Sequence, residues 1–311
     1  MGVSSTPEIP SIIIHHNGVM KLLTSLNPHK ATGPDSIPGR LLKETAKEIT
    51  PALTFIFQAS INQSKIPSDW KTAIVVPVFK KGDRGQPSNY RPISLTSICC
   101  KIMEHIIHSS VLTHLENTNI LSDEQHGFRK RRLCDTQLVL TIHDLAKALD
   151  CGDQIDGILL DFSKAFDNVP HNRLLMKLDH YGVRNNTLSW IRNFLSDRTQ
   201  TVVLERNSSS TNHVASGVPP GTVLGPLLFL VYINDMPGYA RSQTRLFADD
   251  CLMYRKVSST SDCTQLQEDL DNVIKWEQQW QMQFNPDKCE VLTITKKRKP
   301  LHHSNTKLPK L

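Results

Sequence analysis

The chain has no segment suited to a membrane and no cysteine pattern suited to an oxidising compartment. No stretch approaches eighteen uninterrupted apolar residues, and the N-terminus lacks the basic and then apolar layout of a signal peptide. The seven cysteines include no Cys-x-x-Cys pair, and their odd number argues against a full disulfide framework. We therefore expect an intracellular chain with buried free thiols, without zinc and without a membrane partner. Its 311 residues suit one large domain or two subdomains.

Acidic residues are missing from the last sixteen positions. Residues 296–311 carry six lysines and arginines, and the whole chain has a net charge of +6, so residues 1–295 sum to zero. This balance excludes a broadly basic body, and nucleic-acid binding by the body would need local clusters. Two such clusters are Lys80-Lys81 with Arg84, and Arg129-Lys130-Arg131-Arg132. Segment 296–299 is either a nuclear signal or a phosphate contact, or it belongs to a solvated tail without fixed structure.

Hydrophobic spacing and turn residues predict a mixed order of helices and strands, after an irregular leader over residues 1–18. The expected helices cover 19–26, 38–64 with a break near Pro51, 97–117, a segment capped by Asp135 that runs to 149, 171–181, 187–195, 225–234 and 262–284. The expected strands cover 72–79, 90–95, 157–161, 199–205 and 290–295, with a further hairpin at 245–254. This order predicts an α+β fold, in which helices cover one face of an antiparallel sheet.

The most informative residues are the adjacent acids Asp249 and Asp250. Apolar runs flank them at 245–248 and 251–254, so the pattern predicts two carboxylates at a hairpin tip, where mutual repulsion favours a bound cation. An isolated pair of this kind is usually a solvated turn. A third acid, Asp161, closes another apolar run at 158–160. Two buried strands that each deliver acids at one end can converge on a pair of divalent metal ions.

Asp161 and Asp249 lie 88 residues apart, far enough for one to end a central strand and the other to sit at the tip of an adjacent hairpin. Both carboxylates would then bridge two Mg²⁺ ions about 4 Å apart, the separation used for in-line phosphoryl displacement. One ion would activate an attacking hydroxyl, and the other would neutralise a leaving pyrophosphate. Asp250 is expected to be a peripheral ligand or to tune the pair, and Asp167 to be a helix N-cap.

These acids lie within motifs that resemble those of a known enzyme family. Asp161-Phe-Ser-Lys-Ala-Phe-Asp is similar to the first catalytic motif, and Phe247-Ala-Asp-Asp to the second, of reverse transcriptases from LINE-type (non-LTR) retrotransposons of the jockey, CR1 or RTE kind. The resemblance covers roughly residues 20–295 in the family's order, which makes it far more specific than any single motif. The other segments that carry it are Gly33-Pro34-Asp35, Trp70 to Ala73, Phe79 to Gly82, Asn89 to Leu95, Gly127-Phe128-Arg129, Gly217 to Pro226, Tyr232 to Asp235 and Asn285 to Cys289.

The resemblance implies a right-hand polymerase with fingers and palm, and with the thumb largely absent. It assigns residues 19–150 to the fingers and the start of the palm, 151–295 to the palm with the catalytic motifs, and 296–311 to a basic tail. The implied catalytic residues are Asp161, Asp249 and Asp250, which with the backbone of Phe162 would bind two Mg²⁺ ions, or Mn²⁺ as a substitute. The implied nucleotide-binding residues are Lys80, Lys81, Arg91, Phe166, Pro220, Gly221 and Lys288, and the implied nucleic-acid contacts are Arg129, Lys130 and Arg131.

Several implied roles fit the chemistry of the residue types. Arg91 can hold a triphosphate bidentately, with a lysine of the same hairpin as a point charge. Phe166 would exclude a 2′-hydroxyl and so select deoxynucleotides, and Lys288 would be a general acid toward pyrophosphate. The sequence departs from the family at Pro220, where glutamine is usual. Proline there removes a side-chain amide and a backbone donor near the nucleotide.

The resemblance implies an RNA-directed DNA polymerase that extends a DNA primer on an RNA template from deoxynucleoside triphosphates. Target-primed copying would also need an endonuclease, expected on a fuller-length protein, and the work would take place in the cytoplasm and nucleus. Two alternatives stay open. Pro220 and a missing thumb favour a catalytically weak or silent remnant that folds and binds nucleic acid. An RNA-dependent RNA polymerase would share the palm, but Phe166 and the Phe-Ala-Asp-Asp motif argue against it. No oligomeric state is predicted.

Overall fold

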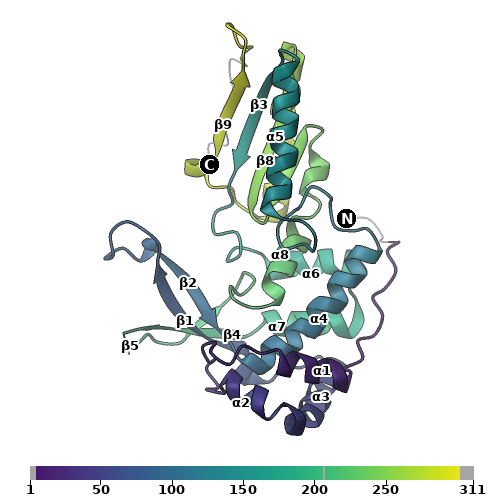
Figure 1. The fold of residues 1–311 in the computed structure, drawn as a ribbon, viewed down its shortest axis with the longest axis vertical. Coiled ribbons are helices and arrows are strands. Elements are labelled where there is room, and N and C mark those ends of the chain that lie inside the picture. The colour runs from purple at the N-terminus through teal and green to yellow at the C-terminus, as the bar shows by residue number, and fades with distance from the viewer. Residues whose placement is uncertain (1–4, 206, 302–311) are drawn as a thin grey trace. The chain divides into compact units, whose positions relative to one another are not determined.

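The computed structural model describes residues 5–205 and 207–301 of the chain. The chain divides into two compact units, each of which combines segments from separate parts of the sequence. Unit 1 consists of Met1–Ile120 and His171–Leu228, and unit 2 of Leu121–Pro170 and Phe229–Leu311. Both units contain helices and strands (Figure 1), so the predicted α+β class is confirmed.

The helices of unit 1 pack around buried aromatic side chains. Trp190 is fully buried and donates a hydrogen bond from Nε1 to Ser60 Oγ at 2.9 Å. Phe57, also fully buried, lies edge-on to Trp70, with ring centroids 5.8 Å apart. The helices of this unit are α1 (His16–Thr24), α2 (Gly39–Glu44), α3 (Ala46–Gln63), α4 (Ile98–Asn117), α6 (His171–His180) and α7 (Asn185–Leu195).

The predicted helix break at Pro51 is wrong. Pro51 lies inside α3, and the chain breaks at Thr45, between α2 and α3. Thr45 has φ −98° and ψ 17°, outside the α-helical region, so it ends one helix and precedes the next. Ala46, Phe57 and Ile61 are buried along α3. Burial of this side keeps the helix continuous even though Pro51 has no N–H to donate.

Unit 1 also contains a sheet with one parallel strand pair, which the sequence pattern did not predict. β1 (Thr72–Phe79) and β2 (Tyr90–Leu95) form the predicted antiparallel hairpin. β4 (Arg198–Leu204) runs parallel to β1. Parallel pairing requires a long crossover connection, and the long chain segment between β2 and β4 supplies it. The short strands β5 (Asn207–Ser208) and β6 (Asn212–Val214) both pair with β4.

Unit 2 is built on a four-stranded antiparallel sheet in the order β7-β8-β3-β9. β3 (Gln154–Leu160) is central and pairs with β8 (Asp250–Val257) on one side and β9 (Glu290–Thr295) on the other. β7 (Gln243–Phe247) and β8 form the hairpin that carries the adjacent acids. The predicted antiparallel sheet and acid hairpin are therefore confirmed.

Helices cover both faces of this sheet, not one face as predicted. α5 (Cys134–Asp150) lies along β3 and β8 (Figure 1), and Ala148 packs there against Ile155 and Tyr254. Met253 and Val257 are also buried, and they point to the opposite face from Tyr254 because side chains alternate along a strand. α9 (Thr260–Trp280) contacts β8 and buries most of its predicted apolar side. The remaining helix, α8 (Leu224–Ile233), starts in unit 1 and ends in unit 2.

Two predicted helix caps are wrong. α5 begins after Leu133, whose N–H donates to the hydroxyl of Thr136 at 2.9 Å, and Asp135 lies in the first turn instead. Asp167 lies in a turn before α6, which begins only at His171. Both acids were assigned from residue type and spacing, which do not fix a helix start to within a residue or two.

The prediction of buried free thiols is confirmed for five of the seven cysteines. All seven cysteines are free, and five of them are buried, whereas Cys134 and Cys151 are exposed. Within the described part of the chain, no helix combines the length and the apolar character needed to cross a membrane.

Candidate active site

Strand pairing brings the three predicted acids to one end of the sheet in unit 2. β3 and β8 pair in antiparallel register up to Leu160 and Cys251, and the next step of that register sets Asp161 opposite Asp250. β7 and β8 close immediately before Asp250, which leaves Asp249 in the two-residue tip of the hairpin. The convergence predicted for two acid-bearing strands is therefore present in the fold.

The electrostatics of Asp250 reflect the proximity of the other acids. Burial raises the pKa of the Asp250 carboxyl, the negative charges of Asp249 and Asp161 raise it further, and Lys288 lowers it. Lys288 Nζ forms an ion pair with Asp161, at 3.0 Å from Oδ1 and 3.2 Å from Oδ2. The lysine thus supplies positive charge beside carboxylates that repel one another.

The ligand types at this end of the sheet suit a hard divalent cation, since they are carboxylates and a backbone carbonyl. Phe162 pairs with Phe284 in an antiparallel bridge whose hydrogen bonds use Asp161 O and Ser163 N, so this pairing does not use the Phe162 carbonyl. Across residues 5–205 and 207–301, no group of three or more acids, histidines and cysteines is already placed to hold a metal ion. A cation bound by Asp161 would compete with the ion pair to Lys288.

Phe166 lies in an aromatic cluster of the same unit. Its ring stacks on Phe229 with centroids 4.7 Å apart and planes at 21°, and Phe128 approaches edge-on at 6.2 Å. Phe166 remains half-buried. Phe128 is 53% exposed and has φ +55°, a conformation that bulky residues rarely adopt. The ring predicted to select the sugar is therefore fixed by its neighbours and still partly accessible.

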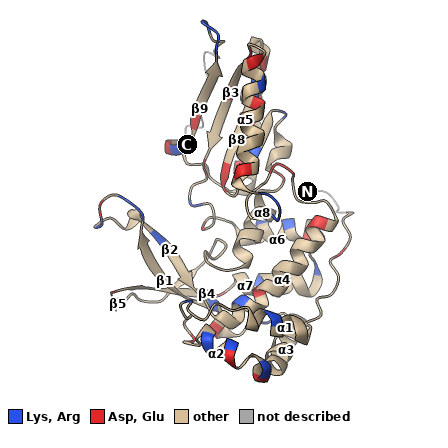
Figure 2. Ribbon diagram, in the orientation of Figure 1, with Lys and Arg blue, Asp and Glu red and all other residues tan. Residues whose placement is uncertain are grey.

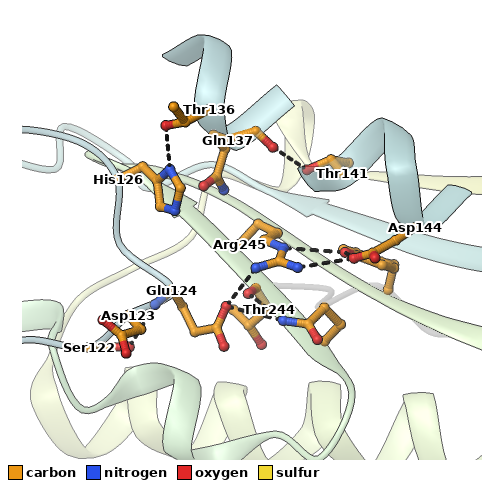
Figure 3. A network of polar contacts seen from close by, with 12 residues as sticks. Ser122, Asp123, Glu124, His126, Thr136, Gln137, Thr141, Asp144, Thr244 and Arg245 are labelled. Carbon is orange, nitrogen blue, oxygen red and sulfur yellow. Dashed lines mark hydrogen bonds and ion pairs between the residues drawn. The ribbon is translucent and has the colours of Figure 1, made fainter. Parts of the chain in front are cut away.

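A polar network that the motifs did not indicate supports β7 below the hairpin tip. Arg245 forms ion pairs with Asp144 of α5 at 3.0 Å and with Glu124 at 3.3 Å (Figure 3). Tyr254 donates a hydrogen bond to the same Asp144 carboxylate, and burial together with this bond raises the pKa of Tyr254 to about 12. The network ties the hairpin to α5. Its only signal in the sequence was an arginine directly before the apolar residues 246–248.

In unit 1, the predicted triphosphate ligands lie on the β1–β2 hairpin, whose connecting loop carries basic residues (Figure 2). Arg91 lies opposite Val78, so both side chains are on one face of the hairpin. Lys80 follows Val78 by two residues and continues on that face, whereas Lys81 lies in a bend beyond the strand. The Lys80 N–H donates to Asn89 O at 2.8 Å and closes the hairpin. The pairing therefore groups Arg91 with Lys80.

The segment around Pro220 and Gly221 packs against β2 in the same unit. Gly221 has φ +80°, and a Cβ at this position would lie 2.7 Å from Ser94 O, so the backbone conformation and the contact both require glycine. Pro220 is half-buried beside it. The predicted tight turn is thus present, and its closest neighbour is the protein's own strand.

Glu104 is a buried acid of α4 that the sequence patterns did not single out. It is fully buried, and its Oε2 accepts hydrogen bonds from Val223 N at 2.6 Å and Leu224 N at 3.0 Å. Burial raises the pKa of Glu104, although these two hydrogen bonds lower it. They satisfy N–H groups that the start of α8 leaves without helical partners. The available signal was an acid between the apolar residues 102–103 and 106–107 of the helix predicted at 97–117.

The predicted nucleic-acid contacts fall into two kinds. Arg129 Nη1 donates to Ser122 O at 2.7 Å, which gives this arginine a structural role in unit 2. Lys130 and Arg131 are exposed. Only these two side chains of the cluster are therefore presented to solvent in the way that a phosphate contact requires.

The geometry can be compared with known proteins. The model of the family described as reverse transcriptase (RNA-dependent DNA polymerase) matches residues 78–305. The chain belongs to the reverse transcriptase family. The matched range contains the three acids, Phe166, the loop around Gly221 and strand β2 with Arg91.

The chain is similar to curated proteins of insect mobile elements. It is 29% identical over 294 residues to the probable RNA-directed DNA polymerase from transposon X-element of Drosophila melanogaster, a match that covers 90% of this chain and 32% of that protein. It is 30% identical over 297 residues to the RNA-directed DNA polymerase from mobile element jockey of the same species, covering 92% and 32%. The chain thus spans about a third of the length of these relatives.

These matches confirm the recognition of a non-LTR retrotransposon reverse transcriptase from its motifs. A further relative is the putative 115 kDa protein in the type-1 retrotransposable element R1DM of Drosophila melanogaster, 30% identical over 236 residues that cover 73% of this chain and 22% of that protein. The roles of single residues, the bound metal, the division into fingers and palm and the place of action in the cell stay predictions.

Proposed function

We propose that this chain is an RNA-directed DNA polymerase that adds deoxynucleotides to the 3′-hydroxyl of a primer on an RNA template. In this proposal unit 2 is the palm, and the β1–β2 hairpin of unit 1 belongs to the fingers. The observation that carries it is the register of β3 and β8, which ends at Leu160 and Cys251, directly before Asp161 and beside Asp250, at the end where the hairpin presents Asp249. The names of the X-element and jockey relatives support the same template and product.

Asp161, Asp249 and the Phe162 carbonyl hold Mg²⁺ in this proposal, with Asp250 as a peripheral ligand and Mn²⁺ as a substitute. When bound, the metal supplies Lewis-acid activation of the attacking hydroxyl and neutralises charge on the leaving group. Lys288 leaves the carboxylate of Asp161 and becomes available to donate a proton to pyrophosphate. The exchange of one positive charge for another keeps the acids neutralised in both states.

Each predicted nucleotide contact has its own role in this proposal. Arg91 binds the triphosphate bidentately, and Lys80, on the same face of the hairpin, adds a point charge. Lys81 contributes only to the field around the hairpin. Phe166, fixed by its stack on Phe229, excludes a 2′-hydroxyl from the sugar site. The loop at Pro220 and Gly221 lies beside the nascent base pair.

Lys130 and Arg131 contact phosphates of the template and primer, because both are exposed and charged. Arg129 orders the segment that carries them. We further propose that the chain acts in the nucleus with an endonuclease, as target-primed copying requires.

Primer extension on poly(rA) with an oligo(dT) primer tests this function. The unchanged chain should incorporate dTTP in Mg²⁺, and Asp249→Ala should reduce the rate by at least about 100-fold, since several kcal/mol of charge stabilisation are lost. Asp271→Ala is the matched control, because Asp271 is an exposed acid on α9 in the same unit. It should extend primers at the rate of the unchanged chain.

Three outcomes would contradict parts of the proposal. Extension that persists in Asp249→Ala would refute the assignment of the acids. Equal use of UTP and dTTP would refute the role of Phe166. Absence of product, together with retained binding of primer and template, would identify a remnant that binds nucleic acid without polymerising.

A further inference from the structure

The residue before Asp249 is held in a strained backbone conformation. Ala248 has φ +55°, in the left-handed region. For a residue other than glycine, this conformation costs about 1–2 kcal/mol and persists only where surrounding contacts enforce it. Because Ala248 is the other tip residue of the hairpin, its conformation sets the direction in which Asp249 leaves the strand.

One buried side chain supplies these contacts. Gln125 is 4% exposed, and its Nε2 donates to Ala248 O at 3.1 Å while its Oε1 accepts from Ala248 N at 2.9 Å. The same Oε1 accepts from Gly127 N at 2.7 Å. The reverse orientation of the amide would set its NH₂ group against two N–H donors, so the pattern fits only one orientation. Gln125 therefore satisfies both backbone polar groups of the strained residue.

The backbone around Gln125 is itself fixed against β7. Leu246 N donates to Glu124 O at 2.9 Å, and His126 N donates to Leu246 O at 2.9 Å, so residues 124–126 add a short parallel bridge beside the strand. A Cβ on Gly127 would lie 2.2 Å from Ala248 N, so this close approach is open only to glycine. The ion pair of Glu124 with Arg245 adds a side-chain link between the same two segments (Figure 3).

We propose that Gln125 is a positioning residue for the acid pair. It holds Ala248 in the left-handed conformation and so directs the Asp249 carboxylate toward the end of β3. This inference rests on the proposed polymerase function, because it assigns Gln125 a part in arranging that site. Side chains that bind a reacting group must be held within about 0.5 Å of the productive geometry, and a misplacement of about 1 Å can cost about 100-fold in rate.

A purely structural role would give a different result, and a second buried glutamine allows the two to be separated. Gln154 is fully buried in the same unit and also makes three side-chain hydrogen bonds, two to the backbone of Leu301 and one to Asp156. It begins β3, whereas Asp161 follows the end of that strand, so the two lie roughly 20 Å apart at about 3.3 Å per residue. Gln154→Ala is therefore a matched control for loss of a buried amide.

The experiment compares Gln125→Ala, Gln125→Glu and Gln154→Ala in primer extension with the full chain. Gln125→Ala should lower kcat by about 10- to 100-fold with a nucleotide KM changed by less than about threefold, as expected for misplaced acids. Gln154→Ala should leave kcat within about twofold of the value for the unchanged chain, even where it lowers Tm by as much as Gln125→Ala does. Gln125→Glu keeps the acceptor for both N–H groups but turns a carboxylate oxygen toward Ala248 O. The kcat of Gln125→Glu should approach that of the unchanged chain as the pH falls from 8 to 6, because the protonated acid can donate a hydrogen bond to Ala248 O.

A second measurement does not depend on activity. Amide exchange of the peptide that contains Ala248 should be about tenfold faster in Gln125→Ala than in Gln154→Ala, because the Ala248 N–H loses its acceptor. Unchanged exchange at Ala248 would overturn the inference, as would equal losses of kcat in the two alanine variants. The unchanged chain could instead fail to extend primers while exchange is faster in Gln125→Ala. This result would count against the proposed function but would support the role of Gln125 in holding Ala248.

Discussion

Replacement of Glu104 by alanine should be among the most damaging single substitutions in unit 1. The change removes the acceptor of two backbone N–H groups, Val223 and Leu224, at the start of α8. Each buried donor left without a partner costs about 1–3 kcal/mol. For the two donors together we expect a loss of about 4 kcal/mol.

Glu104→Gln is the matched control. Its amide oxygen still accepts from an N–H group, so it should cost only about 1–2 kcal/mol. Urea unfolding followed by circular dichroism gives both free energies, and amide exchange at Val223 and Leu224 reports the local effect. A cost below about 1 kcal/mol for Glu104→Ala, or equal costs for the two variants, would refute the assignment of these hydrogen bonds.

The pH dependence of stability, compared between the unchanged chain and Glu104→Gln, gives a further test because its direction is predicted. Burial raises the pKa of Glu104 above its ordinary value. The folded state therefore binds a proton more tightly than the unfolded state, so the contribution of this group is fully present below the unfolded pKa and declines as the pH rises through the raised folded pKa. The stability advantage of the unchanged chain over Glu104→Gln, which does not titrate, should shrink from about pH 4 upward. An advantage that grows with pH would show that the carboxylate is stabilised in its ionised form.

Four further substitutions test other parts of the site. Asp250→Asn should raise Tm at pH 7 in EDTA, because the raised pKa of Asp250 means that its ionisation opposes folding. The gain should vanish below about pH 4, where the aspartate is protonated, and a gain that persists there would contradict the explanation. Lys288→Met should tighten Mn²⁺ binding, measured by electron paramagnetic resonance, while it slows extension, and unchanged binding would show that the lysine does not compete with the metal. Gly221→Ala should cost about 2–3 kcal/mol in urea unfolding, against about 1 kcal/mol for Gly152→Ala, which has a similar φ of +75° but open space around a Cβ. Pro220→Gln should lower the nucleotide KM in steady-state extension, since it restores an amide beside the loop, and an unchanged KM would place Pro220 away from the nucleotide.

The elements with a strong pattern of their own could be predicted from the sequence. β1, β9 and the helix at 97–117 fall within a residue or two of their predicted limits, because alternation and helical spacing act locally. The convergence of Asp161 with the Asp249-Asp250 pair could also be predicted from the sequence, since acids that end buried strands in one sheet meet at its edge. The break at Pro51 failed for the opposite reason. There the burial of one side of α3 outweighed the local preference of proline.

The parallel pairing of β4 with β1 and the cover on both faces of the second sheet could not be predicted in this way. Both features depend on which elements pack together, and the residue pattern of a strand does not indicate which strand or helix it will contact. β4 has few residues that are fully buried, so its sequence resembles that of an edge strand although it lies beside β1. β8 buries the adjacent residues Met253 and Tyr254, as expected of a strand covered on both faces. In the sequence alone, two adjacent apolar residues are also compatible with a strand that is covered on one face.

The supporting residues of the site were missed because their partners lie far away in the sequence. Gln125 contacts Ala248 at a separation of 123 residues, Glu104 contacts Val223 at 119, and Arg245 contacts Asp144 at 101. Each of these polar side chains is buried or half-buried in the fold. Burial of such a group is unfavourable unless it is paired, so its presence predicts a partner even when the sequence does not say which. Two of these side chains hold the backbone beside a catalytic motif and the third braces the strand that leads to one, because hydrogen bonds from a buried side chain can fix a backbone conformation that local preference disfavours. The acids of such a site can be recognised from their motif, whereas the side chains that direct them are found among the polar residues that the structure shows to be buried.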